Sequence, residues 1–492
     1  MTQANNAELR ATDHAPERKR TTTLGIRHLH VALLFTCIAA SYTLRVNLSV
    51  AIVAMIDKDS ANPDFEDFAW NEQTQSLVLS SFFWGYILTQ IPAGQIAEKK
   101  GAKIILLASM LVGAIIAIIT PICTSLGGWE GMCALRVISG MCQGVVYPSV
   151  HTLLSKWIPA AERGPLGTYC YVGAEFGTVI MLALSGVIAS SFMGWPSIFY
   201  FSGAVSLLWS VAWWWLGSNN PDENRWISDG EKDYILASMS TNTEDDRNEK
   251  SAMKLSTPWL PILTSIPFFA LTLTQAAQMW GYWTLMTKTP AYMKNILKFE
   301  LKENALLSAL PYLAKLVMSF VLSVLAQFLQ RRQLFSLNFS RKFFNSIGQW
   351  IPAVLLIGFS YVSHENAEVA VSLLTIAVGI NAAPYLGYQV NHIDLAPNYA
   401  GTLMGITNGV ANIFSIVAPL IVGFIVTDET NPDQWRIIFF IAAAVYFIGN
   451  LMFVIFGRVT TQPWNDPKGN KSPGEISSVN DYGSQNETAV KM

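Results

Sequence analysis

The sequence predicts an all-α integral membrane protein with twelve transmembrane helices, because its composition is too apolar for a soluble chain. Hydrophobic residues make up 51% of the 492 residues and charged residues 13%, whereas soluble proteins carry ~25% charged residues. The mean hydropathy is +0.34 and the isoelectric point is near 6.3. A net charge of −2 argues against a nucleic-acid partner.

Twelve apolar segments follow one another along the chain, and each is close to the roughly 20 residues that cross a bilayer as a helix. They extend over residues 29–56, 73–97, 103–123, 131–155, 167–191, 197–216, 262–287, 304–330, 343–363, 367–391, 399–427 and 436–457. The first 26 residues are polar and lack the short apolar core and cleavage site of a signal peptide. The first segment is therefore expected to stay in the chain as an anchor.

Basic residues predict the orientation of these segments, since cytoplasmic loops carry an excess of Lys and Arg. If both termini are cytoplasmic, 23 basic residues lie on the cytoplasmic side and 6 on the outer side. We therefore expect cytoplasmic tails. The sequence leaves the compartment open between the plasma membrane and the lysosomal membrane.

The longest internal hydrophilic interval, residues 217–258, separates six apolar segments from six others. The stretch GQIAEKKGAK (94–103) follows the second segment, and a weaker echo, AQFLQRRQ (326–333), follows the eighth. Two six-helix halves related by a parallel repeat explain both observations. The predicted regions are a cytoplasmic tail (1–28), a first half (29–216), a cytoplasmic linker (217–261), a second half (262–457) and a cytoplasmic tail (458–492).

Four charged residues lie inside the apolar segments: Arg45, Arg136, Glu175 and Lys315. A charge at the bilayer centre costs ~2.5–3.5 kcal/mol on insertion scales, so each should face a cavity or a partner. Three of the four are cationic, and the planar guanidinium of arginine suits carboxylate or phosphate. A cavity lined by these residues would select anions; the alternative is that each forms a structural ion pair.

Two segments carry polar residues along one helical face. In the first, Arg45 follows Tyr42 at a spacing of three residues. The fourth segment carries polar side chains along its length, at Arg136, Gln143, Tyr147 and His151. Such a stripe lines a pathway or forms a polar packing seam. His151 is either a proton carrier, because histidine titrates near neutral pH, or a hydrogen-bonding lock.

Glu175 lies in GAEFGTVI (173–180), between two glycines four residues apart. Gly173 and Gly177 predict a close-packing helix face, and Glu175 points the other way. Its carboxyl group either titrates during a transport cycle or pairs permanently with Lys315.

Aromatic and amide side chains complete the predicted substrate cavity, although each aromatic residue could instead pack between helices or anchor the chain at the interface. With Arg45 and Tyr42, the predicted set comprises Phe82, Tyr86, Tyr147, Tyr282, Tyr312 and Asn408.

Signatures of enzymes do not occur in the sequence. It contains no P-loop, no HExxH, no G-x-S-x-G and no Cys or His cluster with metal-binding spacing. We therefore predict neither an enzyme nor a cofactor or metal. Without a nucleotide site, transport must run downhill or on an ion gradient.

Several longer motifs resemble a known family. GQIAEKKGAK resembles the loop signature GxxxDRxGRK of the major facilitator superfamily, with Glu98 and Lys99 in place of Asp-Arg. Five further stretches resemble the anion:cation symporter family of sialin, the vesicular glutamate transporters and the type I sodium-phosphate cotransporters, most of all its insect phosphate cotransporter-like members. They are RVNLSVAIVAMI (45–56), SSFFWGYILTQIPAGQIA (80–97), GVVYPSVHTLLSKWIPAAERG (144–164), TPAYMKNILKF (289–299) and VNHIDLAPNYAGTLMGITN (390–408).

The resemblance implies a role for each matching residue. Arg45 matches the arginine that binds the acid group of the substrate, and Tyr42 its aromatic neighbour. Arg136 and His151 match members of the coupling network. The loop implies gating by Gly94, Glu98, Lys99 and Gly101, with the acid latching the end of a neighbouring helix.

Departures from the family pattern concern coupling and substrate. Proton-coupled members carry glutamate where this chain has Gln143, which cannot titrate. Glutamate transporters carry a histidine where this chain has Leu79, and they carry an arginine at a position that falls near Gln278 of this chain. Both differences disfavour glutamate transport. We hypothesise that Glu175 replaces the missing carboxyl group.

The predicted function is secondary active transport of a small anion, which we expect to be organic, coupled to a proton or sodium gradient. The expected partners are this anion, the coupling ion and the lipid bilayer. One alternative is sodium-dependent transport of inorganic phosphate. Others are a ligand sensor or scaffold that does not transport, and an anion channel.

Overall fold

The computed structural model describes residues 24–56, 62, 64–65, 68–159, 162–189, 191–239, 257–297, 301–428 and 430–465. Most of both predicted tails and the middle of the predicted linker lie outside these ranges. Within them the chain forms helices and no strand.

Seven helices come from the predicted first half: α1 (Ile26–Ile56), α2 (Glu72–Lys100), α3 (Ala102–Gln143), α4 (Val146–Trp157), α5 (Arg163–Tyr171), α6 (Gly173–Ala189) and α7 (Pro196–Leu216). The linker contains η4 (Pro221–Glu223) and α8 (Asp229–Met239).

The helix α10 (Trp259–Leu263) crosses the boundary between the predicted linker and the predicted second half, which continues with α11 (Ile266–Asn295), α12 (Leu301–Arg331) and α13 (Leu337–Phe359). Short 3-10 turns then alternate with helices: η5 (His364–Asn366), α14 (Ala367–Ile380), η6 (Ala383–Tyr385), α15 (Tyr388–Leu395), η7 (Pro397–Tyr399), α16 (Ala400–Ile425) and α17 (Pro432–Phe456). The last element, η8 (Pro463–Asn465), lies in the predicted C-terminal tail.

Three predicted continuous segments are broken in the structure. The segment 131–155 ends as α3 at Gln143 and resumes as α4, so its polar face is not one uninterrupted helical stripe. The segment 167–191 is divided at Val172 between α5 and α6. The segment 367–391 is divided by η6. Between the third and fourth segments the chain reverses at Gly128, whose φ of 58° lies in the left-handed region that glycine adopts without strain.

Nine helical stretches within the described residues are long and apolar enough to cross a membrane. One of them, 102–157, contains two predicted segments, which are separated by the non-helical backbone of Gly128. The predicted segments in α11 and α13 are not among the nine. Both helices turn amide side chains inward, including Gln275, Gln278 and Gln349, which lowers their mean hydropathy.

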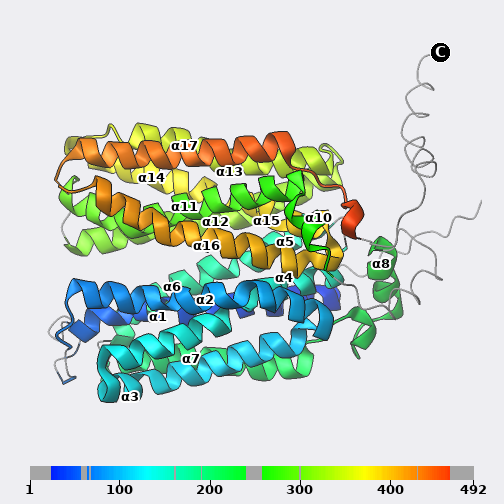
Figure 1. Cartoon of the computed structure of the whole chain (residues 1–492), viewed down its shortest axis with the longest axis horizontal. Coiled ribbons are helices and arrows are strands. Elements are labelled where there is room, and N and C mark those ends of the chain that lie inside the picture. Colours follow the sequence, from blue (N-terminus) through cyan, green and yellow to red (C-terminus); the bar gives the residue numbers. More distant parts are fainter. Residues whose placement is uncertain are drawn as a thin grey trace, which may run out of the picture.

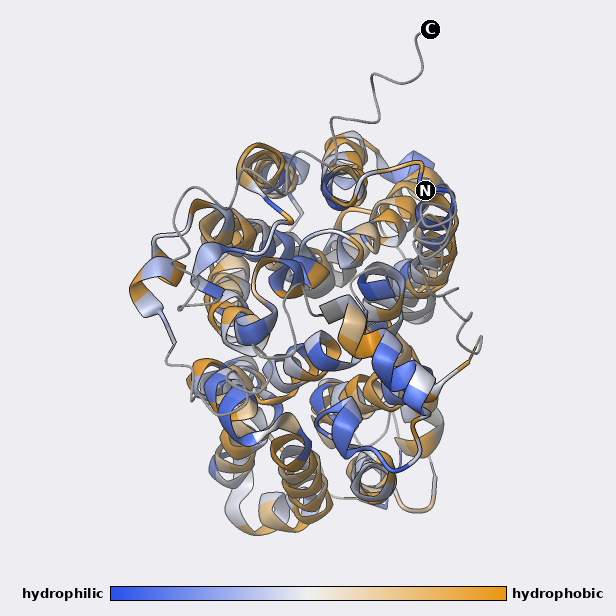
Figure 2. Ribbon diagram, turned by 90° about the vertical axis from the view of Figure 1, so that its right-hand side faces the viewer, coloured by the Kyte–Doolittle hydropathy of each residue, from blue (hydrophilic) through white to orange (hydrophobic). Residues whose placement is uncertain are grey.

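The two groups of helices form two bundles that lie side by side, with α1–α7 below and α11–α17 above in Figure 1. The bundles meet where α2 packs against α16 and where α5 and α6 pack against α12. Figure 2 looks along the helices and shows hydrophobic positions around the perimeter, as expected for a lipid-facing surface.

Both ends of the described chain lie at the end of the bundle that carries α8 (Figure 1). There, Glu231 of α8 accepts hydrogen bonds from the backbone N–H groups of Ile26 and Arg27 and pairs with the Arg27 side chain at 2.9 Å. Because Glu231 supplies acceptors to the first N–H groups of α1, it fixes the linker to the first bundle.

The predicted close-packing face on α6 is confirmed. A side-chain carbon at Gly173 would collide with the backbone carbonyl of Phe35, and one at Gly177 with that of Ala39. Only hydrogen at these positions lets α6 approach α1 so closely. The same contact orients Glu175 away from α1, into the space between the bundles.

We therefore expect Gly177→Ala to destabilise the protein by about 1–3 kcal/mol, the cost of overpacking a tight contact. The matched control is Gly358→Ala, because a side-chain carbon at Gly358 would meet no atom within 4 Å. This control should be neutral or slightly stabilising, since alanine favours helix by about 1 kcal/mol. Thermal unfolding of the two purified variants in detergent measures the difference, and equal melting temperatures would contradict the packing argument.

Candidate functional site

A cavity of about 730 Å³ lies between the two bundles and is lined by helices of both. Its wall includes Ser49 near the end of α1 and Gln73 and Ser76 in the first turns of α2. The cavity therefore extends toward the end of the bundle opposite α8. Its size is that of a pocket for one small molecule.

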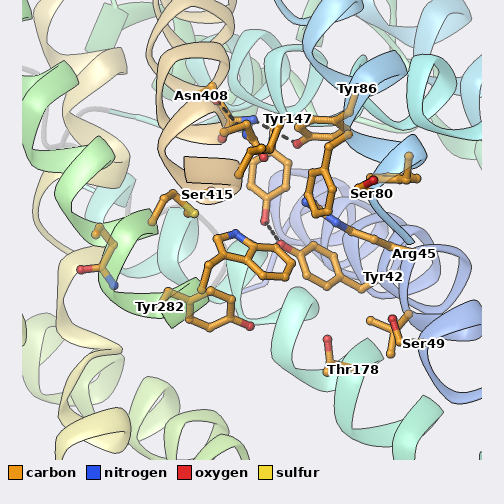
Figure 3. Close-up of a pocket in the computed structure, with 18 of the residues that line it drawn as sticks. Tyr42, Arg45, Ser49, Ser80, Tyr86, Tyr147, Thr178, Tyr282, Asn408 and Ser415 are labelled. Atoms are coloured by element: carbon orange, nitrogen blue, oxygen red, sulfur yellow. Dashed lines mark hydrogen bonds between the residues drawn. The ribbon is translucent and has the colours of Figure 1, made fainter. Parts of the chain in front are cut away.

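Arg45 projects from α1 into this cavity and is surrounded by aromatic rings (Figure 3). Its guanidinium carbon lies 4.8–5.7 Å from five ring centroids, those of Tyr42, Phe82, Phe83, Tyr86 and Trp283. Within the described residues no carboxylate pairs with it, and its buried Nε has no hydrogen-bond partner. Ring faces attract a cation but leave its hydrogen-bond donors free, so Arg45 can hold an anionic group.

Arg136 of α3 shares one of these rings. Its guanidinium carbon lies 4.9 Å from the Phe82 centroid, and its Nη2 donates a hydrogen bond to the Arg45 carbonyl oxygen at 3.4 Å. The residue is 6% exposed and its Nε is also unpartnered. The first bundle thus presents two cations that both lie against one aromatic side chain.

Amide side chains form much of the opposite wall. Gln278 of α11 donates to Asn381 at 2.6 Å, which fixes the end of α14 against α11. Asn408 of α16 donates to the Tyr86 hydroxyl at 3.0 Å and to Gln90 at 3.1 Å. The Asn408–Tyr86 hydrogen bond crosses from one bundle to the other and is drawn in Figure 3.

Glu175 and Lys315 form a second contact between the bundles. Lys315 Nζ lies 2.8 Å from Glu175 Oε1, and the two side chains are 4% and 5% exposed. The Tyr385 hydroxyl donates to the same oxygen at 2.6 Å, while Glu175 Oε2 is buried without a partner. The ammonium group also lies 4.7 Å from the Tyr282 ring centroid. Both charged residues line the cavity.

The predicted coupling residues Gln143 and His151 do not line the cavity. Gln143 accepts a hydrogen bond from Ser41 at 3.2 Å, which ties α3 to α1. His151 Nε2 lies 3.1 Å from the Gln389 carbonyl oxygen, and its ring centroid lies 5.2 Å from that of His392. His151 therefore bridges α4 and α15 beneath the cavity, as a hydrogen-bonding lock would.

The predicted gating residues lie at the end of the bundle that carries α8. Glu98 accepts hydrogen bonds from the Thr402 backbone N–H and hydroxyl, both at 2.7 Å. Thr402 lies in the first turn of α16, where N–H groups lack helical partners and a negative charge is stabilising. A side-chain carbon at Gly94 would collide with the Gly401 carbonyl. Gly101 has a φ of 90° between α2 and α3, and Lys99 is exposed.

A buried charge cluster forms a further contact between the bundles at the end that carries α8, which we call the closed end. Arg341 Nε pairs with Asp394 Oδ2 at 2.8 Å, and Arg163 lies 3.8 Å from Asp394 Oδ1. Arg163 also donates to the Ile393 carbonyl oxygen at 3.4 Å. Since α5 belongs to the first bundle and α15 to the second, this cluster joins the bundles beside the Glu98 contact.

The structure brings together most of the predicted substrate residues. Tyr312 is the exception, because its ring lies beside Tyr282, at a centroid distance of 6.2 Å, outside the cavity wall. Trp283, Tyr385 and the Asp394 cluster were missed. Asp394 lies in a stretch that also carries Gln389, Asn391 and His392, so no apolar run marked its carboxylate as a buried charge.

A family comparison agrees with this geometry. The chain matches the Major Facilitator Superfamily over residues 34–419. The chain belongs to the major facilitator superfamily. It is therefore a membrane transporter of two six-helix halves, and the predicted family and fold class are confirmed.

Three relatives show which branch of the superfamily this transporter resembles. A "Putative inorganic phosphate cotransporter" of Drosophila ananassae is 40% identical over 88% of this chain and 93% of its own. Human sialin is 37% identical over 87% of this chain and 89% of its own. Human vesicular glutamate transporter 2 is 33% identical over 92% of this chain and 78% of its own. The predicted resemblance to the anion:cation symporter family is thereby confirmed.

Solved structures share the fold of this transporter at low identity. The proton:xylose symporter XylE superposes with a TM-score of 0.65 at 17% identity, covering 89% of this chain and 96% of its own. FucP in an outward conformation superposes with a TM-score of 0.61 at 14% identity, covering 86% of this chain and 97% of its own.

We expect Asp394→Asn to destabilise the transporter by about 3–5 kcal/mol, because it leaves the buried charges of Arg341 and Arg163 uncompensated. Asp433→Asn provides the matched control: its ion pair with Arg436 is 75% exposed at the carboxylate, so its loss should cost at most about 1 kcal/mol. Thermal unfolding in detergent compares the two variants. A melting temperature unchanged by Asp394→Asn would show that the cluster does not stabilise the closed end.

Proposed function

We propose that this protein is a secondary active transporter that binds a small organic anion at Arg45 and couples its movement to a cation gradient. The observation that supports this most directly is the uncompensated guanidinium of Arg45 in a cavity shared by both halves. A charge in the membrane interior requires a counterpart, and an anionic substrate supplies it.

The sidedness follows from the prediction that both tails are cytoplasmic. The closed end carries α8, Glu98 and the Asp394 cluster and is then cytoplasmic, while the cavity opens to the outer or luminal side. Alternating access requires the contacts at the closed end to break when the substrate moves inward. The membrane is the plasma membrane or a lysosomal membrane.

We infer that Glu175 carries the coupling proton. Gln143 has no titratable group, whereas Glu175 lines the cavity, bridges both halves and retains one free oxygen. Protonation would weaken its ion pair with Lys315 and so change the contact between the bundles.

Sodium-dependent phosphate transport is the second candidate, and the 40% identity to a "Putative inorganic phosphate cotransporter" is the observation that favours it. Phosphate also fits an arginine. The two candidates differ in the gradient that drives uptake and in the anion that is moved.

For Arg45→Ala we expect a loss of affinity of about 10- to 100-fold, because a hydrogen bond to a charged group contributes about 1.5–3 kcal/mol. The measurement is uptake of labelled anions into proteoliposomes, with phosphate, glutamate, sialic acid and urate as the panel. Arg436→Ala is the control, because Arg436 is paired at the surface with Asp433. Undiminished uptake by Arg45→Ala would refute this binding role. Binding without uptake or counterflow in the wild type would instead identify a ligand sensor.

A second experiment tests coupling. Glu175→Gln should abolish the stimulation of uptake by an imposed proton gradient while substrate counterflow without a gradient persists, since only the driven step needs a titrating group. Glu223→Gln serves as the control, because Glu223 lies in the linker. Proton-driven uptake that survives Glu175→Gln excludes the proposed role, and stimulation by sodium alone favours the phosphate alternative.

A further inference from the structure

The charges that line the cavity are arranged in two groups of different kind. Arg45 and Arg136 in the first half have no carboxylate partner within the described residues, whereas Lys315 in the second half is paired with Glu175 at 2.8 Å. As long as that pair is intact, the second wall carries no net charge. The cavity therefore offers a substrate the arginines of the first half as anchoring cations, whereas Lys315 is already paired.

We propose that Lys315 is a second substrate-binding cation that Glu175 masks, and that a substrate with two acid groups replaces Glu175 when Glu175 takes up a proton. This proposal rests on the proposed function and specifies its substrate class. One acid group would bind Arg45 on α1 and the other Lys315 on α12, so the substrate would contact both halves.

The groups around Glu175 determine how its charge changes when the substrate replaces it at Lys315. Lys315 and Tyr385 of the second half contact its carboxylate, and the other titratable groups that interact with it electrostatically are Tyr42, Tyr147, Tyr282 and Tyr388. Phenols are neutral near pH 7, so among these groups Lys315 alone is charged. Lys315 and Tyr385 both contact Oε1, which leaves the unpartnered Oε2 as the atom that accepts the proton.

Charge balance then links the proton to the substrate. Protonating Glu175 with no substrate present would leave Lys315 as a buried, unpaired cation, which is strongly unfavourable. Arg136 contacts Phe82 and the Arg45 carbonyl in the first half, so Lys315 is the only cation paired with Glu175 among the described residues. Binding a dianion to Arg45 and Lys315 without the proton would place two negative groups, Glu175 and one acid group of the substrate, against the single charge of Lys315. Only proton and dianion together leave Lys315 with one negative partner, so each promotes binding of the other.

The exchange also gives the substrate a way to act on the conformation. In the structure the Glu175–Lys315 pair joins α6 to α12. When the substrate replaces Glu175, that direct link between the halves is lost and the substrate itself bridges α1 and α12. A ligand that interacts differently with two conformations shifts their populations.

Binding of matched acids to purified protein tests the proposal. The dicarboxylates succinate, glutarate and adipate are compared with butyrate, valerate and hexanoate at pH 7.5, so that the ligands do not change protonation. Binding is followed by thermal stabilisation and by quenching of the fluorescence of Trp283, which lies beside Arg45. We expect Glu175→Gln to tighten dicarboxylate binding about ten-fold or more, the effect of gaining a contact with a charged group, and to change monocarboxylate binding less than about two-fold.

Removing the ammonium group of Lys315 should have the opposite effect on ligand selectivity. Lys315→Met should abolish the preference for two acid groups, while monocarboxylates still bind through Arg45. The double variant Glu175→Gln/Lys315→Met restores neutrality, so it should fold even if a single variant does not, and it should behave like Lys315→Met. Lys232→Met in the linker is the matched control for loss of a lysine.

The outcomes separate this proposal from the proposed function. If the wild type and Glu175→Gln favour dicarboxylates equally, or Lys315→Met retains that preference, the masking role is wrong although organic-anion transport stands. If no carboxylate binds or is taken up by the wild type, both are overturned.

Discussion

The low dielectric of the membrane makes any unpaired charge inside the bundle expensive, and this constraint explains the arrangement of the charged residues. Glu175 pairs with Lys315, and Asp394 pairs with Arg341 and lies near Arg163. Arg45 and Arg136 are different, because aromatic rings and one backbone carbonyl surround them instead of carboxylates. The protein thus tolerates two incompletely compensated cations at one place, the wall of the central cavity.

The contacts between the halves divide into two layers along the bundle. At the closed end, Glu98 binds the first turn of α16 and Asp394 joins α15 to α5 and α13. In the cavity wall, Asn408 forms a hydrogen bond with Tyr86, and Glu175 forms an ion pair with Lys315. The contacts at the closed end involve residues outside the cavity wall, so they can stabilise one conformation without a ligand. The other contacts line the cavity, so a bound anion can compete with them directly.

Glycine and amide side chains make this geometry possible. Close approach of α6 to α1 depends on Gly173 and Gly177, and that approach directs Glu175 toward α12. Amides such as Gln278 and Asn408 satisfy one another across helix interfaces without net charge. Gln275 and Gln278 also lower the hydropathy of α11, which lines the cavity but is not among the nine candidate membrane spans of the described residues.

The sequence by itself determined the membrane class, the approximate positions of the segments, the two halves and the family, because apolar length and local motifs are properties of contiguous residues. It also singled out Arg45, Arg136, Glu175 and Lys315, since a charge inside an apolar run is visible without a structure. Tertiary structure decided which of them meet: Glu175 and Lys315 are 140 residues apart in the chain, and only packing of α6 against α12 pairs them. It also placed Gln143, His151 and Tyr312 outside the cavity wall: α3 ends at Gln143, His151 lies against the Gln389 carbonyl oxygen, and Tyr312 lies beside Tyr282. Spacing along a helix predicts a shared face, but the partner of that face is fixed by the packing of the whole bundle.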